Sequence, residues 1–302
     1  MRLKTTLDQW LTLYEVDRAG SIQAAAAQLN KSHTTLIYAI RKLEEQLGVS
    51  LVRIEGRRAV LTDDGQSLLR RAAPMLDQAR ELEVIGSQLS QGIESEITVT
   101  IDHLCNRDWL YRPLSEFLAS NHGTSIQIRE TSLSSTRDAV EKQQADIAII
   151  NFPITNHLVE AFGVTTMIPM VSRTHPLAAK DRVCTEDLHT ATQIIVRDLG
   201  QVEELQTQNV GWLKSQQRIT VDNFDHAWKA VNEGLGFCRI PDHMLATLDT
   251  TNMVQLPLEG GSRYQVPLHL VLPKAGRTGP AAKALYELLL ADAGQRISGE
   301  SG

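Results

Sequence analysis

Apolar side chains recur at intervals of three and four residues in three runs near the amino terminus, which is the spacing of one face of an α-helix. The first run covers residues 7–16 and follows two threonines that can cap a helix. Ser21 opens the second run, the alanine-rich "SIQAAAAQL", and Ser32 opens the third, which ends before Gly48. Residues 30–31 form a polar turn between the second and third runs. The pattern therefore predicts three short helices.

The third helix is predicted to have an apolar face and a polar face. Its apolar residues step by four, three and four positions and are Leu36, Ile40, Leu43 and Leu47. Two short helices joined by a tight turn are typical of the helix-turn-helix, whose second helix enters the major groove of DNA by its first turn. Free backbone amides there can meet phosphate oxygens, and Thr35 is small enough for close approach. Tyr38 and Arg41 can reach the DNA backbone or base edges one turn further on. The other interpretation is a three-helix surface domain with solvated charges.

A predicted hairpin adds positive charge beside this helix. "VSLVRIEGRRAVLT" is typical of two short strands around Glu55-Gly56, and its arginines Arg53, Arg57 and Arg58 would meet phosphates. The chain carries a formal net charge of -6, but residues 1–60 hold nine basic and six acidic side chains, so this segment carries +3 and the remainder -9. A basic segment on an acidic body favours nucleic acid as a partner. The residues predicted to contact DNA are Ser21, Ser32, His33, Thr34, Thr35, Tyr38, Arg41, Arg53 and Arg57.

A long helix is predicted after Thr62, which can cap it, with two aspartates in the first turn. Small residues occupy one heptad position between 65 and 89 and large apolar residues occupy the other. A narrow seam of this kind needs a partner helix, and a second copy of the chain is the simplest one, although the helix could instead pack on its own domain. Pro74 is expected to kink the helix. The predicted dimer seam consists of Leu68, Ala72, Met75, Ala79, Leu82 and Leu89.

From about residue 93 onward, strand patterns alternate with helix patterns. "EITVTID", "SIQIRE" and "ADIAII" are typical of strands, with the helices "WLYRPLSEFLAS" and "SSTRDAVEKQQ" between them, and a second series ends in the helix "GPAAKALYELLLADAG". This alternation predicts parallel sheets with crossover helices, arranged as two small subdomains around a ligand cleft. Ligands of such sheets bind at the carboxyl ends of strands. The candidate ligand-binding residues are Asp102, His103, Asn106, Thr131, Ser132, Ser134, Asn151, Arg197, Asn223 and Phe224, although residues of these types also cap helices.

Several classes of protein are disfavoured by the sequence. Cys105, Cys184 and Cys238 are odd in number and far apart, which fits a reducing compartment better than a disulfide framework or a metal site. No apolar run is long enough to cross a membrane, and the amino terminus lacks a secretory pattern. "GLGF" lacks the third glycine of a dinucleotide fingerprint, and "DNFDH" is better explained as a helix cap than as a metal site. The sequence therefore predicts no enzyme, no catalytic residue, no cofactor and no metal.

Residues 7–65 resemble the DNA-binding domain of LysR-type transcriptional regulators. The matching features are "GSIQAAAAQL", the serine that opens the third helix, "IRKLEEQLGVSL", the arginine after it, and "LTDDG". Ile37 stands where that family usually has serine or threonine, and Val52 replaces the usual phenylalanine. The carboxy-terminal part is similar to the effector-binding domain of the same family through "ADIAI", "HPLA", "VNEGLGFCRIP" and "LHLVLPK".

The resemblance implies an α/β protein in three parts: a winged helix-turn-helix, a long linker helix that dimerises, and a two-subdomain effector domain similar to periplasmic solute-binding proteins. The expected boundaries are 1–62, 63–92 and 93–302, with subdomain I at about 93–164 and 267–300 and subdomain II at about 165–266.

The function that this resemblance implies is that of a cytoplasmic bacterial regulator, a homodimer or homotetramer. It would bind promoter DNA under the control of a small-molecule effector in the cleft, with RNA polymerase as a candidate further partner and no membrane association. The alternative is a small-molecule sensor whose amino-terminal domain serves assembly only. The two functions predict different results: the affinity for promoter DNA should fall steeply as the salt concentration rises if the protein is a regulator, but not if it is a sensor.

Overall fold

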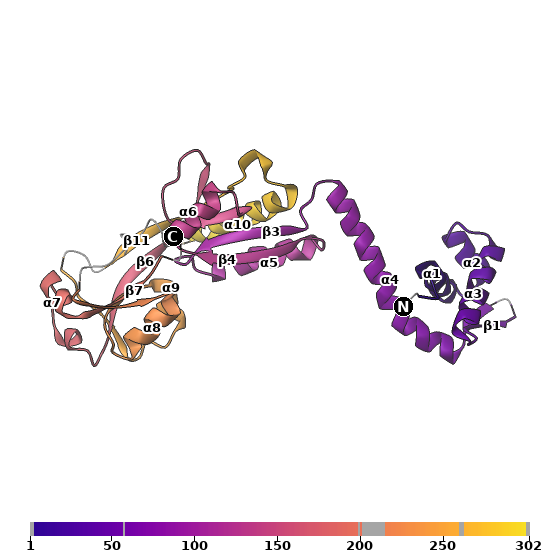
Figure 1. The fold of residues 1–302 in the computed structure, drawn as a ribbon, viewed down its shortest axis with the longest axis horizontal. Coiled ribbons are helices and arrows are strands. Elements are labelled where there is room, and N and C mark those ends of the chain that lie inside the picture. The colour runs from indigo at the N-terminus through magenta and orange to yellow at the C-terminus, as the bar shows by residue number, and fades with distance from the viewer. Residues whose placement is uncertain (1–2, 57, 199, 201–214, 260–262, 300–302) are drawn as a thin grey trace. The chain divides into compact units, whose positions relative to one another are not determined.

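The computed structural model describes residues 3–56, 58–198, 200, 215–259 and 263–299. The chain forms two compact units, residues 1–90 and residues 91–302. The first unit is mainly helical, and the second combines strands with helices (Figure 1).

Three short helices form most of the first unit, as the apolar spacing predicts: α1 (Leu7–Ala19), α2 (Ile22–Gln28) and α3 (His33–Leu47). Each follows a residue whose hydroxyl oxygen accepts a hydrogen bond from a backbone N–H of the first turn, namely Thr6, Ser21 and Ser32. Gly48 ends α3 with a left-handed backbone, φ 74°, which costs glycine little. The predicted stripe is confirmed, because Leu36, Ile40 and Leu43 are buried and Leu47 is partly buried against the core.

The predicted hairpin is also confirmed. Strands β1 (Val52–Glu55) and β2 (Arg58–Leu61) pair antiparallel. The carboxylate of Glu44 on α3 accepts hydrogen bonds from the backbone N–H groups of Leu51, at 2.7 Å, and Val52, at 3.2 Å. Because these bonds tie the base of the hairpin to α3, the wing and the third helix are positioned as one surface.

Helix α4 (Asp63–Ser90) closes the first unit and contains Pro74. The hydroxyl of Thr62 accepts a hydrogen bond from the backbone N–H of Gly65 at 3.0 Å, which confirms the predicted cap. Leu69, Ala72 and Leu76 in its first half are buried. The ribbon of α4 bends part-way along its length (Figure 1), as expected for a helix with an internal proline.

The second unit is organised around a mixed sheet. Its strands, in spatial order, are β10 (Met253–Gln255), β6 (Val159–Ser172), β11 (Tyr264–Val271), β5 (Ile147–Ile150), β3 (Glu96–Asp102) and β4 (Ser125–Thr131), and β9 (Cys238–Pro241) also pairs with β6. Strands β4, β3 and β5 are parallel, as predicted. The expectation of a parallel sheet is wrong for the remaining strands. Strand β11 runs antiparallel to β5 and β6, because the chain leaves along β6 and returns beside it along β11, and β9 and β10 also run antiparallel to β6.

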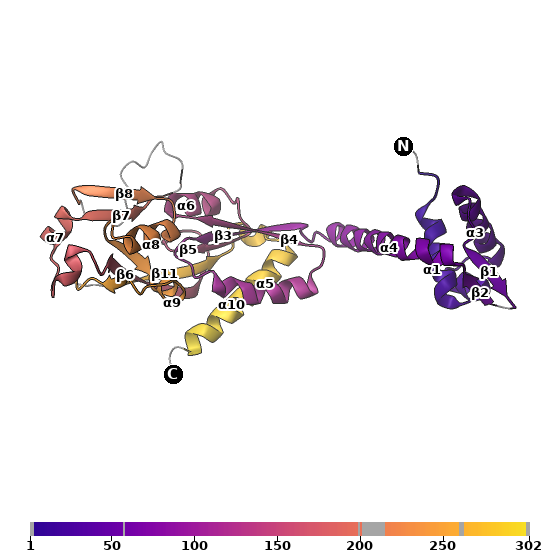
Figure 2. The same ribbon diagram turned by 90° about the horizontal axis from the view of Figure 1, so that it is seen from below.

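Helices cover both faces of the parallel part, which we call the first lobe. Helices α5 (Asp108–Ser120) and α10 (Pro280–Gly299) lie on one face and α6 (Leu133–Glu141) on the other (Figure 2). The alternation of strand side chains explains this arrangement: Ile147 and Ile149 pack in the core with α5 and α10, whereas Ala148 and Ile150 pack in a cluster with Val140 of α6. The short helix η2 (Ala275–Arg277) precedes α10.

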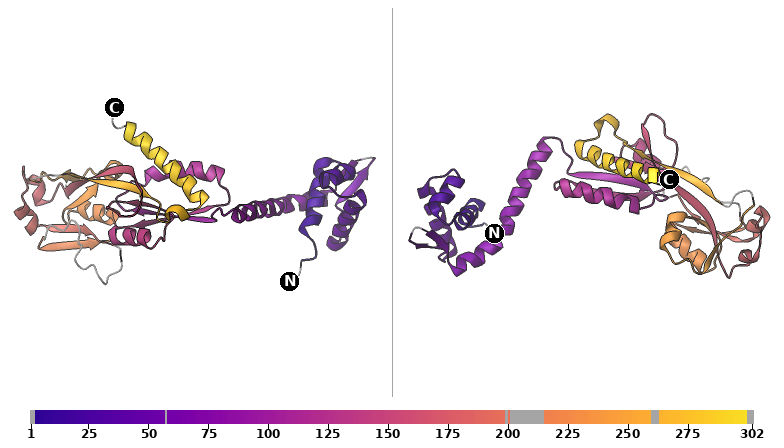
Figure 3. Two further views of the ribbon diagram at one scale, coloured as in Figure 1. Left: turned by 90° about the horizontal axis from the view of Figure 1, so that it is seen from above. Right: turned by 180° about the vertical axis from the view of Figure 1, so that it is seen from behind.

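The second lobe contains a separate parallel pair, β7 (Thr192–Val196) and β8 (Gln217–Val221). It also contains η1 (Pro176–Ala179), α7 (Thr185–Thr190), α8 (Phe224–Asn232) and α9 (Asp242–Thr247). Strands β6 and β11 lie side by side and continue from the first lobe toward the second (Figure 3). The carboxyl ends of β3 and β5 in one lobe and of β7 in the other therefore approach a common space.

Candidate DNA-binding face and ligand pocket

The start of α3 presents exposed polar side chains. The hydroxyl of Ser32 accepts a hydrogen bond from the backbone N–H of Thr35 at 3.1 Å and also lies 2.8 Å from the hydroxyl of Thr34. His33, Thr34 and Thr35 are exposed, as is Tyr38, with 69% of its surface accessible. Because the Ser32 side chain is occupied as a cap, its backbone amide is the group that remains for an outside acceptor.

Positive charge flanks this face. Arg41, one turn further along α3, is exposed, and no ion pair is found for it within the described chain. Arg53 of the wing donates to a carboxylate oxygen of Glu55 at 2.8 Å, in a pair whose two members are more than half exposed. An exposed pair of this kind contributes little free energy, so phosphate can compete for the arginine. Arg58 is exposed, and Arg57 lies outside the described residues.

A groove runs between α3 and the wing. Ile37, half-buried, lines it together with Arg41, with Gln23 of α2 and with Ile54 of the wing. Gln23 and Ile54 were not predicted as site residues. The sequence signal for Ile54 is an apolar residue at an outward-facing position of the predicted hairpin. In the structure its side chain is 62% exposed, so it has no packing role in its own unit. The residue that departs from the family pattern, Ile37, thus lines a groove with both apolar and polar residues.

The predicted seam on α4 divides into two parts. Ala72 is buried within the first unit, and Leu68 packs partly against the cluster that contains Leu13 and Leu43. This part of the seam therefore serves the unit's own core. Further along, Met75, Leu82 and Leu89 are 40%, 68% and 50% exposed, and Ala79 is half-buried.

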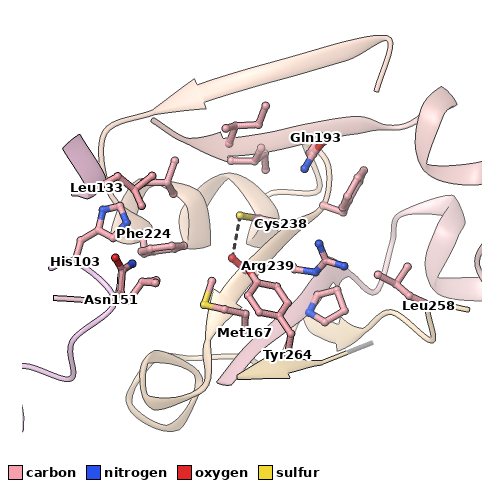
Figure 4. A pocket seen from close by; sticks show the side chains of 16 residues that line it. His103, Leu133, Asn151, Met167, Gln193, Phe224, Cys238, Arg239, Leu258 and Tyr264 are labelled. Carbon is pink, nitrogen blue, oxygen red and sulfur yellow. Dashed lines mark hydrogen bonds between the residues drawn. The ribbon is translucent and has the colours of Figure 1, made fainter. Parts of the chain in front are cut away.

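A cavity of about 100 Å³ lies between the two lobes of the second unit (Figure 4). Three of the ten predicted ligand residues line it, namely His103, Asn151 and Phe224. They come from the carboxyl ends of β3 and β5 and from the start of α8. Other residues that line the cavity were not predicted from the sequence. They lie on strands β6, β7, β9 and β11 and include Met167, Gln193, Cys238, Arg239 and Tyr264.

Asp102 lies behind this cavity and is fully buried. Its carboxylate accepts hydrogen bonds from the backbone N–H of Leu104 at 3.0 Å, from the hydroxyl of Thr136 at 3.4 Å and from the side-chain amide of Asn151 at 3.3 Å. Burial raises the pKa of Asp102 to about 7 despite these bonds. Asp102 therefore positions Asn151 and is not itself a contact surface for a ligand.

Burial has the opposite effect on the neighbouring imidazole. It lowers the pKa of His103 to about 4, because the charged form of the ring loses its hydration. The ring packs edge-on against Phe224 with 5.1 Å between centroids. His103 is consequently neutral near pH 7.

These two shifts give opposite dependences of stability on pH. The pKa of Asp102 is higher in the folded protein than in the unfolded chain. Ionisation of Asp102 therefore lowers the free energy of unfolding increasingly as the pH rises from 3.8, the ordinary pKa of aspartate, to about 7, its pKa in the folded protein. His103 has a lowered folded-state pKa, so it costs stability increasingly as pH falls from 6.5 to about 4.

Asp102→Asn removes the effect of Asp102 on the pH dependence of stability. We expect the free energy of unfolding of this variant, measured by urea titration, to fall more steeply than the wild type as pH drops from 6.5 to 4, by about 1 kcal/mol per pH unit. Asp181→Asn, at an exposed position, is the control, and equal slopes for all three proteins would contradict the assignment.

Asp198 joins the two lobes by hydrogen bonds. It follows β7, and its carboxylate accepts hydrogen bonds from the backbone N–H of Ser134 at 3.2 and 3.3 Å and from the hydroxyl of Ser132 at 3.3 Å. Ser132 and Ser134 lie at the start of α6, where free amides favour a negative charge. The predicted ligand residues Ser132 and Ser134 thus already hold a carboxylate of the chain itself.

The other predicted ligand residues are occupied by local structure. The hydroxyl of Thr131 is paired with that of Thr136 at 2.8 Å, and the Asn106 side chain accepts from the backbone N–H of Asp108 at 3.1 Å. The Asn223 side chain caps α8 by accepting from the backbone N–H of His226 at 2.9 Å. Arg197 is exposed and forms an ion pair with Asp222. For these positions the capping or pairing interpretation fits better.

Neither a membrane span nor a metal cluster is found in the part of the chain that the structure describes. Its helices are too short or too polar to cross a bilayer, and its histidine, cysteine, aspartate and glutamate side chains do not gather in groups that could hold a metal ion.

Two family models match the chain over these same units. One is described as "Bacterial regulatory helix-turn-helix protein, lysR family" and matches residues 7–66. The other is described as "LysR substrate binding domain" and matches residues 90–294. The chain belongs to the LysR family of transcriptional regulators. This LysR-type regulator binds promoter DNA, and a small molecule held by its substrate-binding domain modulates that binding.

Curated relatives agree with this membership, and a solved structure has a similar fold. The regulator is similar to the HTH-type transcriptional regulator YhaJ of Escherichia coli O157:H7, with 28% identity over 247 residues that cover 80% of this chain and 81% of that protein. It is 24% identical to the RuBisCO operon transcriptional regulator of Allochromatium vinosum over 300 residues, which cover 96% and 97% of the two chains. Full-length LysG from Corynebacterium glutamicum has a similar fold, with a TM-score of 0.51, 18% identity, and 96% and 98% of the two chains covered.

Proposed function

We propose that this regulator reads its promoter with the first turn of α3 and grips the DNA backbone with the wing. The observation that carries the proposal is the exposed, capped start of α3. Tyr38 is exposed there, as are the side chains of Thr34 and Thr35, whose hydroxyls lie 2.8 and 2.7 Å from the hydroxyl of Ser32. Arg41 and Arg53 supply charge on either side of that face. Recognition of base edges by side chains and of phosphates by arginines and amides is the division of labour expected for a helix-turn-helix.

We further propose that the regulator works as a homodimer or homotetramer in the bacterial cytoplasm, where its DNA partner lies. The exposed residues Met75, Leu82 and Leu89 of α4 would face a second copy, since together they form an apolar stripe with no cover in the described chain. A dimer holds two recognition helices one helical turn of DNA apart, about 34–36 Å, or a multiple of it. RNA polymerase remains a candidate further partner, and this mode of action needs no catalytic chemistry.

The proposed effector site is the cavity between the lobes. Its walls come from both lobes, so a molecule bound there would contact residues that move relative to one another when the lobes close or open. A ligand shifts the population of arrangements only if it binds one of them better than the other. The proposed boundaries of the three parts remain 1–62, 63–92 and 93–302.

Two substitutions test the proposed DNA contacts. Thr35→Ala removes the hydroxyl that would face a base edge, so we expect altered preference among operator variants, about tenfold at one position. Arg53→Ala removes a phosphate contact, so we expect weaker binding to every sequence and a salt slope reduced by about one. Fluorescence anisotropy across a salt series measures both.

Arg112→Ala serves as the control for these variants. It removes one exposed positive charge from the second unit and should leave affinity and sequence preference unchanged. If the wild type bound all duplexes equally, or if Arg112→Ala weakened binding as much as Arg53→Ala, the sensor alternative would gain support.

A further inference from the structure

Arg239 brings a positive charge into the cavity without a negative charge to match it. It lies on β9, is half-buried, and stacks on the ring of Tyr264 with 5.2 Å between its guanidinium carbon and the ring centroid. Its Nε atom is buried and has no hydrogen-bond partner, and among the described residues no carboxylate forms an ion pair with it. Leaving such a donor unpaired is costly, so a ligand acceptor is the expected partner.

The opposite end of the cavity is polar but neutral. Figure 4 shows His103 and Asn151 at one end and Arg239 with Gln193 at the other, with Met167, Phe224 and Tyr264 between them. The amide nitrogen of Asn151 donates to Asp102 at 3.3 Å, which leaves its buried oxygen without a partner in the described chain. That oxygen needs a hydrogen-bond donor from the ligand.

Among the described residues near the cavity, the start of α6 would also favour an anion, but this place is already filled. The start of α6 holds the carboxylate of Asp198, bonded to the backbone N–H of Ser134 and the hydroxyl of Ser132. A second negative charge beside Asp198 would be repelled, and neutral His103 offers no compensating charge. Within the cavity, the anion-binding end is therefore that of Arg239.

We propose that the effector is a small organic carboxylate that carries a hydroxyl or N–H group at the far end of an apolar body. Its carboxylate accepts charge-assisted hydrogen bonds from the fork of Arg239, its body packs between Met167 and Phe224, and its donor bonds the side-chain oxygen of Asn151. The proposal rests on the assignment of the cavity as the effector site. It adds the chemical class of the molecule and the residues that select it.

Calorimetric titration of the full-length protein tests this selection. The probes are 2-, 3- and 4-hydroxybenzoate and the terminal hydroxyalkanoates of four to six carbons, each beside its primary amide and its deoxy analogue. At millimolar concentrations we expect at least one carboxylate to bind about tenfold or more tightly than its amide, and more tightly than its deoxy analogue. Binding of none of the carboxylates, or binding of the amides with equal affinity, overturns the proposal.

Variants assign the binding to residues. Arg239→Gln should abolish the preference for carboxylate over amide, and Arg239→Lys should retain part of it because the charge remains without the planar fork. Asn151→Leu should abolish the preference for the hydroxylated over the deoxy compound and keep that for the carboxylate. Arg173→Gln, at an exposed position in the second lobe, is the control. An unchanged preference in Arg239→Gln, with a native circular-dichroism spectrum, overturns the proposal.

A parallel DNA-binding measurement separates this inference from the proposed function. If the wild type binds operator DNA specifically and a neutral or cationic compound in the cavity changes that binding, the regulatory proposal stands and the carboxylate proposal fails. If the carboxylate binds as expected but no operator is recognised, the carboxylate proposal stands and the proposed DNA contacts fail.

Discussion

Replacing Leu82 with glutamate is expected to convert the protein to a monomer and to lower its affinity for operator DNA by about a hundredfold or more. Leu82 is 68% exposed on α4, between Met75 and Leu89 at heptad spacing. A carboxylate there would be buried without a partner when two copies of α4 meet. Once the copies separate, each recognition helix must bind its half-site alone, so the gain from linking two sites is lost. Light scattering gives the mass, and anisotropy titration gives the affinity.

Ser87→Glu is the matched control for this variant. It introduces the same charge five residues away on the same helix, at an exposed position off the seam, and should leave both mass and affinity unchanged. If Leu82→Glu kept the mass of the wild type, α4 would not be the dimer contact. If both variants became monomers, charge on α4 in general, not the seam, would be responsible.

Replacing Gly65 with alanine is expected to destabilise the first unit by about 3 kcal/mol. Gly65 lies in the first turn of α4, and a Cβ atom there would sit 2.2 Å from the carbonyl oxygen of Leu51. The neighbouring backbone is held in place, because Leu51 also receives a hydrogen bond from Thr62 through this same oxygen and donates one to Glu44. The methyl group must therefore push α4 away from the wing. Thermal unfolding followed by circular dichroism, together with operator binding, measures the effect.

Gly86→Ala provides the comparison within the same helix. A Cβ at Gly86 meets no atom within 4 Å in the described chain. In the Leu82→Glu background, where no second copy of α4 faces Gly86, the substitution should therefore stabilise the helix by about 1 kcal/mol through its better helix propensity. A stability loss of equal size in the two variants would show that helix propensity and not the contact with Leu51 sets the requirement for glycine.

Local sequence signals were sufficient for most of the first unit. Thr6, Ser21 and Ser32 are caps that act on amides within three residues, and the stripe of Leu36, Ile40 and Leu43 follows from the helical repeat. Such features depend on neighbours along the chain, so spacing alone identifies them. The division of the α4 seam could not be predicted in this way, because Ala72 and Leu82 occupy seam positions and only the packing of α1 on α4 buries the first.

For the ligand pocket, less could be predicted from the sequence than for the first unit. The carboxyl-end rule selected His103 and Asn151, which line the cavity, but it also selected Asn106, Asn223 and Arg197, which cap a helix or pair with a neighbour. It missed Arg239 because this residue follows no strand end and has no sequence neighbour that marks it.

By itself, the sequence determined the helices, the wing, the basic amino-terminal face and the α/β alternation, since each depends on residues a few positions apart. Only the tertiary structure decided that β11 returns beside β6, that Asp198 reaches across to α6, and that Arg239 remains unpaired opposite Asn151. The first two contacts join residues 64 to more than 100 positions apart, and the third feature is the absence of a partner. Neither produces a periodic pattern in the sequence, so spacing along the chain could not predict them.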